Sequence, residues 1–325
     1  MFSKIRPVWF AVVLSLISLI LLNLSSSGSN SSFASFPVKI SKANSFVDPE
    51  GDHHVVGTVR NEGYTPVQVQ LAMKIQNSLG NSEIAVAPTF GSTIYPFTEA
   101  PFKFDILKRD SISGLPYILQ VKEVNSPYYD LLTQNYTTMN ATIGKKLVGS
   151  IKNTGSLILH NVSVYASVHQ EDGAQIDSVK SKTIPILRPG EEARYVAIPD
   201  PAVQSRAVYF SCAGWDINAP INTIAVGNGR FIPYSLEGAA KITEFTYSRT
   251  DDSLTFSADH YSPLGGTVKL SIPEVSNAHA LTILLDGKVD GNAKIEKNGK
   301  TLSAEIFVPP DAHVITVKGV LAQSM

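Results

Sequence analysis

The fold is decided by a short stretch that occurs twice in the chain. The sequence reads VGTVRNEG at residues 56–63 and VGSIKNTG at residues 148–155, so the second copy follows the first at an offset of 92 residues. The same offset aligns Ile94 with Ile186. One register that holds over distant segments indicates an internal repeat. We therefore expect two tandem copies of one domain.

Within each copy, apolar residues alternate with polar or small ones. The alternation runs from Val67 to Ile75 in the first copy and from Val162 to Val168 in the second. A period of two predicts strands with one face on a core and the other in solvent, as in antiparallel sandwiches. Sequences rich in Gly, Asn and Pro separate the runs. No stretch after residue 24 has a helical period, so we predict an all-β fold.

The last part of the chain also has the pattern of a β-sandwich, with turn residues between short runs. Asn298–Gly299 between two alternating runs predicts a hairpin. Seven strands are predicted, at residues 241–247, 253–258, 267–272, 281–285, 293–297, 302–308 and 313–318. The predicted domains are therefore three sandwich modules after an N-terminal leader, with boundaries at 1–35, 36–128, 129–229 and 230–325.

The leader predicts export. Lys4 and Arg6 precede an apolar run over residues 8–24, which is the pattern of a secretory signal or a signal anchor. The positive flank places everything after the run outside the cytoplasm. Residues 25–35 are rich in serine and predict a flexible stalk. We expect the chain at the extracytoplasmic face of the cell membrane, anchored by one N-terminal transmembrane helix, or secreted if the leader is cleaved.

Four sequons are candidate glycosylation sites in an exported protein, at Asn30, Asn135, Asn140 and Asn161. The single cysteine, Cys212, excludes an intrachain disulfide, so the modules depend on their hydrophobic cores. Charged residues make up 17% of the chain and the net charge is −1. Because no module is strongly basic, nucleic acid is not an expected partner.

The sequence has none of the usual catalytic motifs, such as G-x-S-x-G, H-E-x-x-H or a phosphate-binding glycine loop. We therefore expect neither an enzyme nor a cofactor. Asp52, His53 and His54, in the acidic segment 48–54, are the candidate metal ligands. The same composition is also that of an acidic turn before a strand, and both interpretations stay open.

Aromatic residues gather near the predicted module ends, at Tyr128, Tyr129, Trp215 and Tyr234. Side chains of this kind bind sugars, or they pack neighbouring modules together. Short linkers between the modules favour packing.

The motif V-G-x-(V/I)-x-N-x-G, at 56–63 and 148–155, precedes an alternating strand, and L-x-P-G-E follows it at 187–191. This order resembles the FxLYD-type immunoglobulin-like modules of prokaryotic surface proteins. The first copy departs from it, with YPFTE at 95–99. The C-terminal part resembles a module of unknown role in archaeal exported proteins. The resemblance implies three tandem immunoglobulin-like sandwiches and a surface location, but no reaction.

These observations together predict a non-enzymatic, membrane-anchored structural, adhesion or scaffold protein. The alternative is a ligand-binding protein or an accessory subunit of a membrane or envelope complex. Its partner would then be an envelope protein or a glycan, or it would bind a metal.

Overall fold

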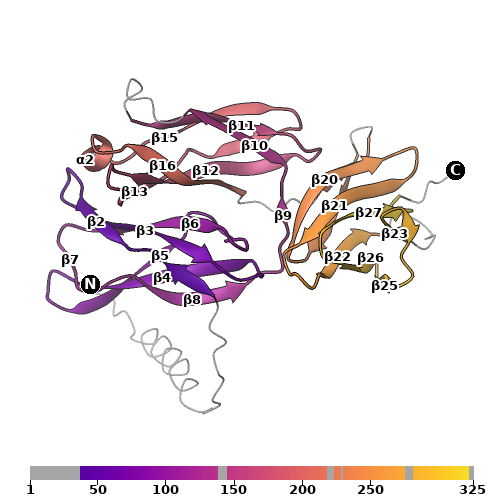
Figure 1. The fold of residues 1–325 in the computed structure, drawn as a ribbon, viewed down its shortest axis with the longest axis horizontal. Helices are drawn as coiled ribbons and strands as arrows, with labels where there is room; N and C mark the ends of the chain where they lie inside the picture. Colours follow the sequence, from indigo (N-terminus) through magenta and orange to yellow (C-terminus); the bar gives the residue numbers. More distant parts are fainter. Residues whose placement is uncertain (1–36, 138–144, 218–222, 228–229, 275–280, 322–325) are drawn as a thin grey trace, which may run out of the picture. The chain divides into compact units, whose positions relative to one another are not determined.

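The computed structural model describes residues 37–137, 145–217, 223–227, 230–274 and 281–321. Within these ranges the chain is all-β, and α2 (Pro201–Gln204) is the one helix (Figure 1). No helix of the described ranges is both long and apolar enough to cross a bilayer. The predicted membrane segment, 8–24, lies outside the described residues.

The first pair of sheets is formed by residues 38–123. One sheet contains β1 (Val38–Ile40), β2 (Asn44–Val47), β3 (His53–Asn61) and β6 (Glu99–Ile106). The other contains β4 (Val67–Gln76), β5 (Ser82–Pro88), β7 (Ser111–Ile112) and β8 (Tyr117–Glu123). Val59, Leu71 and Phe102 are buried between the two sheets in one core. The predicted alternation in β4 is confirmed, since its apolar residues from Val67 to Ile75 are buried.

The second pair of sheets is formed by residues 132–217. One sheet contains β10 (Leu132–Thr137), β11 (Leu147–Asn153) and β15 (Glu192–Ala197). The other contains β12 (Leu159–His169), β13 (Gln175–Lys180), β14 (Ile184–Leu187) and β16 (Tyr209–Ile217). Ile151, Val164 and Leu187 belong to its core.

These two pairs share their strand pairings. β3 pairs with β6 as β11 pairs with β15, and β4 pairs with β5 and β8 as β12 pairs with β13 and β16. The repeat departs from the constant offset at one point. Val67 pairs with Ile94, whereas Leu159 pairs with Leu187. Ile186, the residue that the offset of 92 matched to Ile94, is 40% exposed. The alignment of Ile94 with Ile186 is therefore wrong by one residue, and Leu187 is the structural equivalent of Ile94. The second copy has one extra residue between Leu159 and Leu187.

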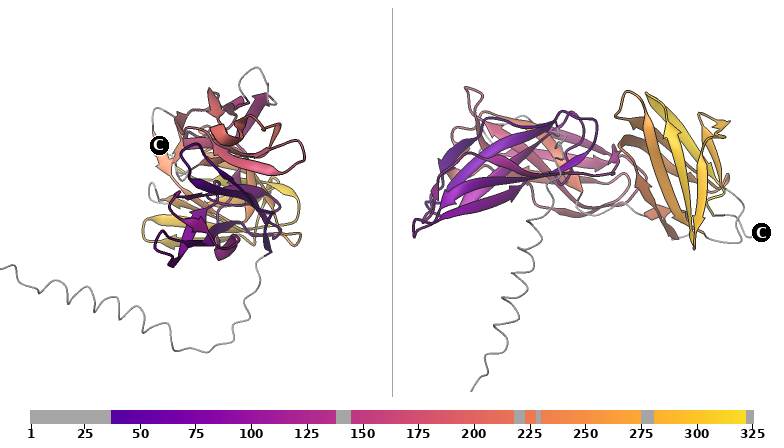
Figure 2. Two further views of the ribbon diagram at one scale, coloured as in Figure 1. Left: turned by 90° about the vertical axis from the view of Figure 1, so that its left-hand side faces the viewer. Right: turned by 90° about the horizontal axis from the view of Figure 1, so that it is seen from below.

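The third pair of sheets contains most of the remaining strands. One sheet has the order β19-β22-β26-β25 and the other β24-β23-β27-β21-β20-β9. The strands from β20 to β27 are drawn in orange and yellow in Figure 2. The seven predicted strands are confirmed within two residues at each end, as β20 (Ala240–Ser248), β21 (Ser253–His260), β22 (Gly266–Pro273), β23 (Thr282–Leu285), β25 (Lys294–Asn298), β26 (Thr301–Val308) and β27 (Ala312–Lys318). Four further short strands are β17 (Thr223–Ala225), β18 (Phe231–Pro233), β19 (Ser235–Glu237) and β24 (Lys288–Val289).

The connection between the first two pairs is itself a strand of the third. β9 (Tyr128–Tyr129) lies parallel to β20, with Tyr128 opposite Lys241 and Tyr129 opposite Ile242. The backbone N–H of Asp130 donates to the carbonyl oxygen of Ile242 at 2.9 Å. β9 therefore joins the edge of a sheet whose other strands come from the last third of the chain.

The first and second pairs contact each other through sheet faces. The Ser178 hydroxyl donates to the carbonyl oxygen of Phe102 at 2.8 Å, and the Gln175 amide to that of Gly57 at 3.2 Å. As a result, β12 is buried on both faces, and Ser163 and Ser167, on the face predicted to meet solvent, are completely buried. Residues Phe36–Met325 form one compact unit. The module boundaries within it stay a prediction.

Candidate functional site

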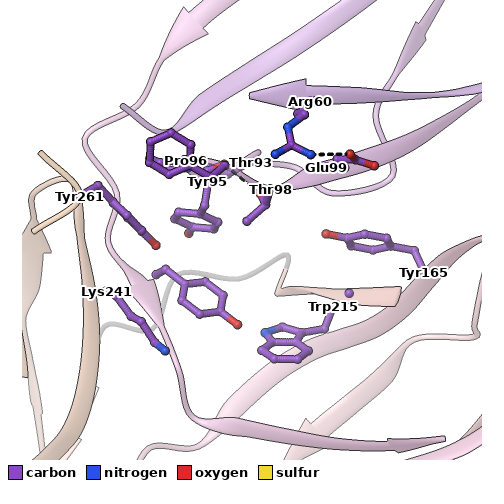
Figure 3. Close-up of a pocket in the computed structure, with 13 residues that line it drawn as sticks. Arg60, Thr93, Tyr95, Pro96, Thr98, Glu99, Tyr165, Trp215, Lys241 and Tyr261 are labelled. Atoms are coloured by element: carbon purple, nitrogen blue, oxygen red, sulfur yellow. Dashed lines mark hydrogen bonds and ion pairs between the residues drawn. The ribbon is translucent and has the colours of Figure 1, made fainter. Parts of the chain in front are cut away.

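A pocket of about 540 Å³ lies where residues of all three sheet pairs meet. Its wall includes six aromatic side chains: Tyr95, Phe97, Tyr128, Tyr165, Trp215 and Tyr261 (Figure 3). This volume falls within the roughly 300–1,000 Å³ that is usual for small-molecule sites. Most of these rings are only half-buried, so a ligand in the pocket would touch their exposed faces.

The six rings come from five segments, because Tyr95 and Phe97 share one. Tyr95 lies between β5 and β6 of the first pair, Tyr128 in β9, and Tyr261 just after β21. Tyr165 lies in β12 and Trp215 in the neighbouring β16. Five segments that are far apart in the sequence therefore supply the aromatic wall.

Tyr165 occupies space that two glycines leave open. A Cβ atom at Gly91 or at Gly214 would lie 2.8 Å from the tyrosine hydroxyl oxygen, closer than van der Waals contact allows. Gly91 belongs to the first pair and Gly214 to β16. The ring of Tyr165 thus fits between two backbone segments that carry no side chain at the point of contact.

The rings also contact one another. Tyr95 meets Tyr128 edge to face at 5.0 Å between centroids, and Tyr128 stacks on Trp215 at 6.0 Å. Tyr261 lies 6.4 Å from Tyr95. These distances are typical of favourable aromatic pairs. The two sequence-based interpretations of Tyr128 and Trp215 are therefore compatible, because the same rings connect the sheet pairs and line the pocket.

Charges at the pocket are balanced in pairs. Arg60 Nη1 lies 3.0 Å from Glu99 Oε1, and Lys241 Nζ lies 2.6 Å from Asp130 Oδ2. Burial is the main cause that raises the pKa of the Tyr128 and Tyr261 hydroxyls above its ordinary value. Both hydroxyls therefore stay neutral and can donate hydrogen bonds. The pocket offers apolar ring faces, neutral hydroxyls and paired charges.

Tyr129 and Tyr234, the other two predicted aromatics, lie away from the pocket. Their hydroxyl oxygens are 3.3 Å apart, and both rings pack against Phe245 in the third pair. Burial is the largest cause that raises both tyrosine pKa values. These two residues pack β9 onto the third pair.

The predicted metal ligands separate in the structure. Residues 48–52 form the turn between β2 and β3, where Asp52 Oδ1 accepts the backbone N–H of Lys108 at 2.8 Å. His53 and His54 are successive residues of β3, so their side chains point to opposite faces of the sheet. Asp52 and His53 do not join His54 in one cluster.

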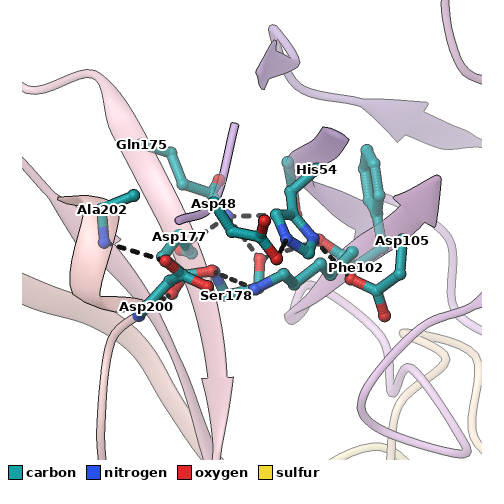
Figure 4. Close-up of polar contacts among 11 residues, drawn as sticks. Asp48, His54, Phe102, Asp105, Gln175, Asp177, Ser178, Asp200 and Ala202 are labelled. Carbon is teal, nitrogen blue, oxygen red and sulfur yellow. Dashed lines mark hydrogen bonds and ion pairs between the residues drawn. The ribbon is translucent and has the colours of Figure 1, made fainter. Parts of the chain in front are cut away.

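His54 lies instead among three other carboxylates (Figure 4). Its Nε2 is 3.1 Å from Asp48 Oδ2, and its Nδ1 is 2.7 Å from Asp105 Oδ1. Ligand atoms of Asp48, His54 and Asp200 all lie within 4.8 Å of one another. Asp48 belongs to the predicted acidic segment, but no sequence pattern associates Asp105 or Asp200 with His54.

Asp48 is held in its ionised form. Burial raises the pKa of its carboxyl, but hydrogen bonds from His54 and from the backbone N–H groups of Asp52 and Gly51 outweigh burial and leave the pKa below its ordinary value. Asp48 is therefore an anion at neutral pH.

Two of the candidate glycosylation sites lie within the described residues. Asn135 and Asn161 are exposed. Asn30 and Asn140 lie outside the described residues.

Comparison with known proteins leaves the family open. No family model matches the chain, and no curated protein matches it. The resemblance to FxLYD-type modules therefore stays a prediction.

Proposed function

We propose that this chain is an exported, non-enzymatic binding protein that holds a glycan in its aromatic pocket. In this proposal an N-terminal anchor, or a cleaved signal, places three immunoglobulin-like sandwich modules of the FxLYD type at the extracytoplasmic face of a membrane. The protein then acts as an adhesion or scaffold protein, and the pocket is the means of adhesion. Cell fractionation with N-terminal sequencing of the mature chain tests the location.

The observation that carries the proposal is the aromatic wall shared by three sheet pairs. A sugar ring has an apolar C–H face that packs on aromatic rings and a rim of hydroxyls that needs hydrogen-bonding partners. Tyr128, Tyr261 and Trp215 provide both, since each has an apolar ring and one polar donor. None of these three donors has a hydrogen-bond partner among the described residues.

The ligand is expected to be a neutral sugar. Arg60 is neutralised by Glu99, and Lys241 by Asp130, so the described lining residues carry no unpaired charge that would select an anionic or a cationic ligand. Such paired groups can still hydrogen-bond to hydroxyls at the rim.

Binding fits this wall better than hydrolysis does. Glycoside hydrolases use two carboxyl groups on either side of the scissile bond. Of the described residues that line the pocket, Glu99 is the one carboxylate, and it is in an ion pair with Arg60. The geometry therefore supports retention of a glycan without a reaction.

A glycan array screened with the full-length chain tests the proposal. The chain is kept in a detergent without a sugar headgroup, so that the detergent does not compete. We expect binding to neutral oligosaccharides and at least a tenfold loss of affinity in Trp215→Ala, because removing a central aromatic side chain costs about 2 kcal/mol or more in binding.

Phe307→Ala is the matched control. Phe307 is 54% exposed on β26 and does not line the pocket. This variant should bind as the wild type does. An array on which the wild type binds no glycan, or on which Trp215→Ala binds equally well while both proteins unfold at the same temperature, would contradict the proposal.

A further inference from the structure

We propose that Asp48, His54 and Asp200 bind one divalent transition-metal cation, for which Zn²⁺ is the best fit. The site is independent of the glycan pocket and lies between the first and second sheet pairs. Asp48 and His54 come from the β2–β3 turn and from β3, and Asp200 precedes α2. A bound ion would connect two sheet pairs that are otherwise joined by side-chain and backbone contacts.

The carboxylates are positioned by their own backbone contacts. Asp48 Oδ1 accepts the backbone N–H of Asp52 at 2.8 Å, and Asp200 Oδ1 accepts that of Ala202 at 2.9 Å. One oxygen of each carboxylate is thus engaged in fixing the side chain. The second oxygen of Asp48 faces His54, and the second oxygen of Asp200 has no hydrogen-bond partner among the described residues. A cation between them would replace the contact of Asp48 Oδ2 with His54 and would also bind the second oxygen of Asp200.

Asp105 orients the imidazole as metal sites require. Asp105 Oδ1 lies 2.7 Å from His54 Nδ1, so this nitrogen can keep its proton and donate it to a carboxylate. His54 Nε2 lies 3.1 Å from Asp48 Oδ2, and a cation bound at Nε2 would take the place of the proton on that nitrogen. A histidine that binds a metal through one ring nitrogen almost always donates its other N–H to a carboxylate, a carbonyl or water. Asp105 is therefore a positioning residue and not a ligand.

The net negative charge of the cluster also favours the binding of a cation. His54 is 7% exposed, and three carboxylates surround it. Among the ion pairs of the described residues, neither Asp48 nor Asp200 has a lysine or arginine partner. The nearby Lys103 is paired with Asp177 at 3.1 Å. Clustered carboxylates that are partly withdrawn from water repel one another. A divalent ion would offset this repulsion.

The ligand set distinguishes among metals. One imidazole nitrogen with two carboxylate oxygens suits Zn²⁺, which binds nitrogen and oxygen at about 2.0–2.2 Å and fills a fourth position with water. Ca²⁺ and Mg²⁺ prefer shells made of oxygen alone. We therefore expect Zn²⁺ to bind more tightly than either of these ions.

Zinc titration of the metal-stripped, full-length chain tests the site. Affinity is measured against a chromophoric chelator, and the unfolding temperature is followed with and without zinc. Zinc should bind at one equivalent and raise the unfolding temperature. Asp200→Asn should weaken binding at least 100-fold. Asn is as good a helix N-cap as Asp, so this change removes the charge and keeps the contact with Ala202. Asp105→Asn should weaken binding about 10- to 100-fold.

His53→Ala is the matched control, because it removes the neighbouring histidine on the opposite face of β3. It should leave zinc affinity unchanged. A wild-type chain that binds zinc no more tightly than Asp200→Asn would overturn the proposal, and so would an equal loss in His53→Ala. If Asp200→Asn unfolds at a lower temperature than the wild type without zinc, Asp105→Asn, which changes an exposed side chain, decides the question.

Discussion

Asn61 and Asn153 make the same three kinds of hydrogen bond in the two copies of the repeat. In each copy the side-chain amide donates to two backbone carbonyls, and the side-chain oxygen accepts the N–H of the glycine two residues later. The carbonyls are those of Thr65 and Ile94 in the first copy and of Leu157 and Leu187 in the second, and the glycines are Gly63 and Gly155. In both copies, the asparagine of the repeated N-x-G motif is therefore buried, and its side-chain hydrogen bonds hold the turn closed.

Replacing Asn153 by Ala should destabilise the protein by about 3 kcal/mol. Asn153 is fully buried, so the change leaves two carbonyls and one N–H without partners away from water. Urea unfolding followed by circular dichroism measures the loss. Asn77→Ala serves as the control, because Asn77 makes similar bonds to Leu79 and Asn81 in an exposed turn, where water can replace them. If both variants lost the same free energy of unfolding, burial of the Asn153 hydrogen bonds would not contribute to stability.

The residues of the metal cluster show where prediction from sequence stops. Asp48 and His54 lie within one acidic segment, and the sequence drew attention to that segment. The sequence also suggested Asp52 and His53, but strand geometry turns His53 away and the turn engages Asp52. Asp105 and Asp200 reach His54 only through sheet pairing and packing. No local spacing rule could have identified them.

At the scale of elements, the period of two predicts strands well and their surroundings less well. The alternation in β4 and β12 correctly identifies the core face of each. It predicts solvent on the opposite face of β12, where the structure has the first sheet pair instead. Ser163 and Ser167 are polar residues on that buried face, and their hydroxyls have no partner among the described residues. Small polar residues are compatible with either solvent or a close contact, so the sequence pattern could not distinguish the two.

The sequence pattern also does not determine the exact position of a turn or the pairing of an edge strand. The hairpin predicted at Asn298–Gly299 is present, but its loop residues are Gly299 and Lys300, since Asn298 still pairs with Thr301. Gly299 has a positive φ of 60°, a backbone conformation that glycine adopts without steric cost. The sequence did not predict β9, because a strand of two residues is too short to show alternation. Its partner, β20, is also far away in the sequence.

The contact between β6 and β13 includes a buried ion pair. Lys103 Nζ lies 3.1 Å from Asp177 Oδ1, and the two side chains are 16% and 1% exposed. Lys103→Met should destabilise the protein by about 3 kcal/mol, because it leaves the Asp177 charge buried without its cation. Urea unfolding of the full chain measures this change.

Lys39→Met is the control for the same substitution in an exposed ion pair. Lys39 Nζ lies 2.6 Å from Glu62 Oε2, and the two side chains are 71% and 36% exposed. We expect a loss below about 1 kcal/mol, since surface ion pairs contribute little. If Lys103→Met were as mild as Lys39→Met, the buried pair would not hold the two sheet pairs together.

At the scale of the whole molecule, the pocket exists because three sheet pairs meet around β9. The sequence identified Tyr128 and Trp215 as aromatics near predicted module ends, where they would pack modules or bind sugars. It did not identify Tyr95, Tyr165 or Tyr261, because each lies in or beside a strand whose pattern is explained by the fold alone. Convergence of these rings is a property of tertiary packing.

The emission of Trp215 tests glycan binding at this pocket most directly. The chain has two tryptophans, Trp9 in the N-terminal apolar run and Trp215 in the pocket, so Trp9→Phe leaves Trp215 as the single reporter. Titration with the tightest-binding glycan should change its emission saturably, with the same dissociation constant that calorimetry gives. Calorimetric binding of that glycan with no change in Trp215 emission would place the ligand elsewhere and contradict the account.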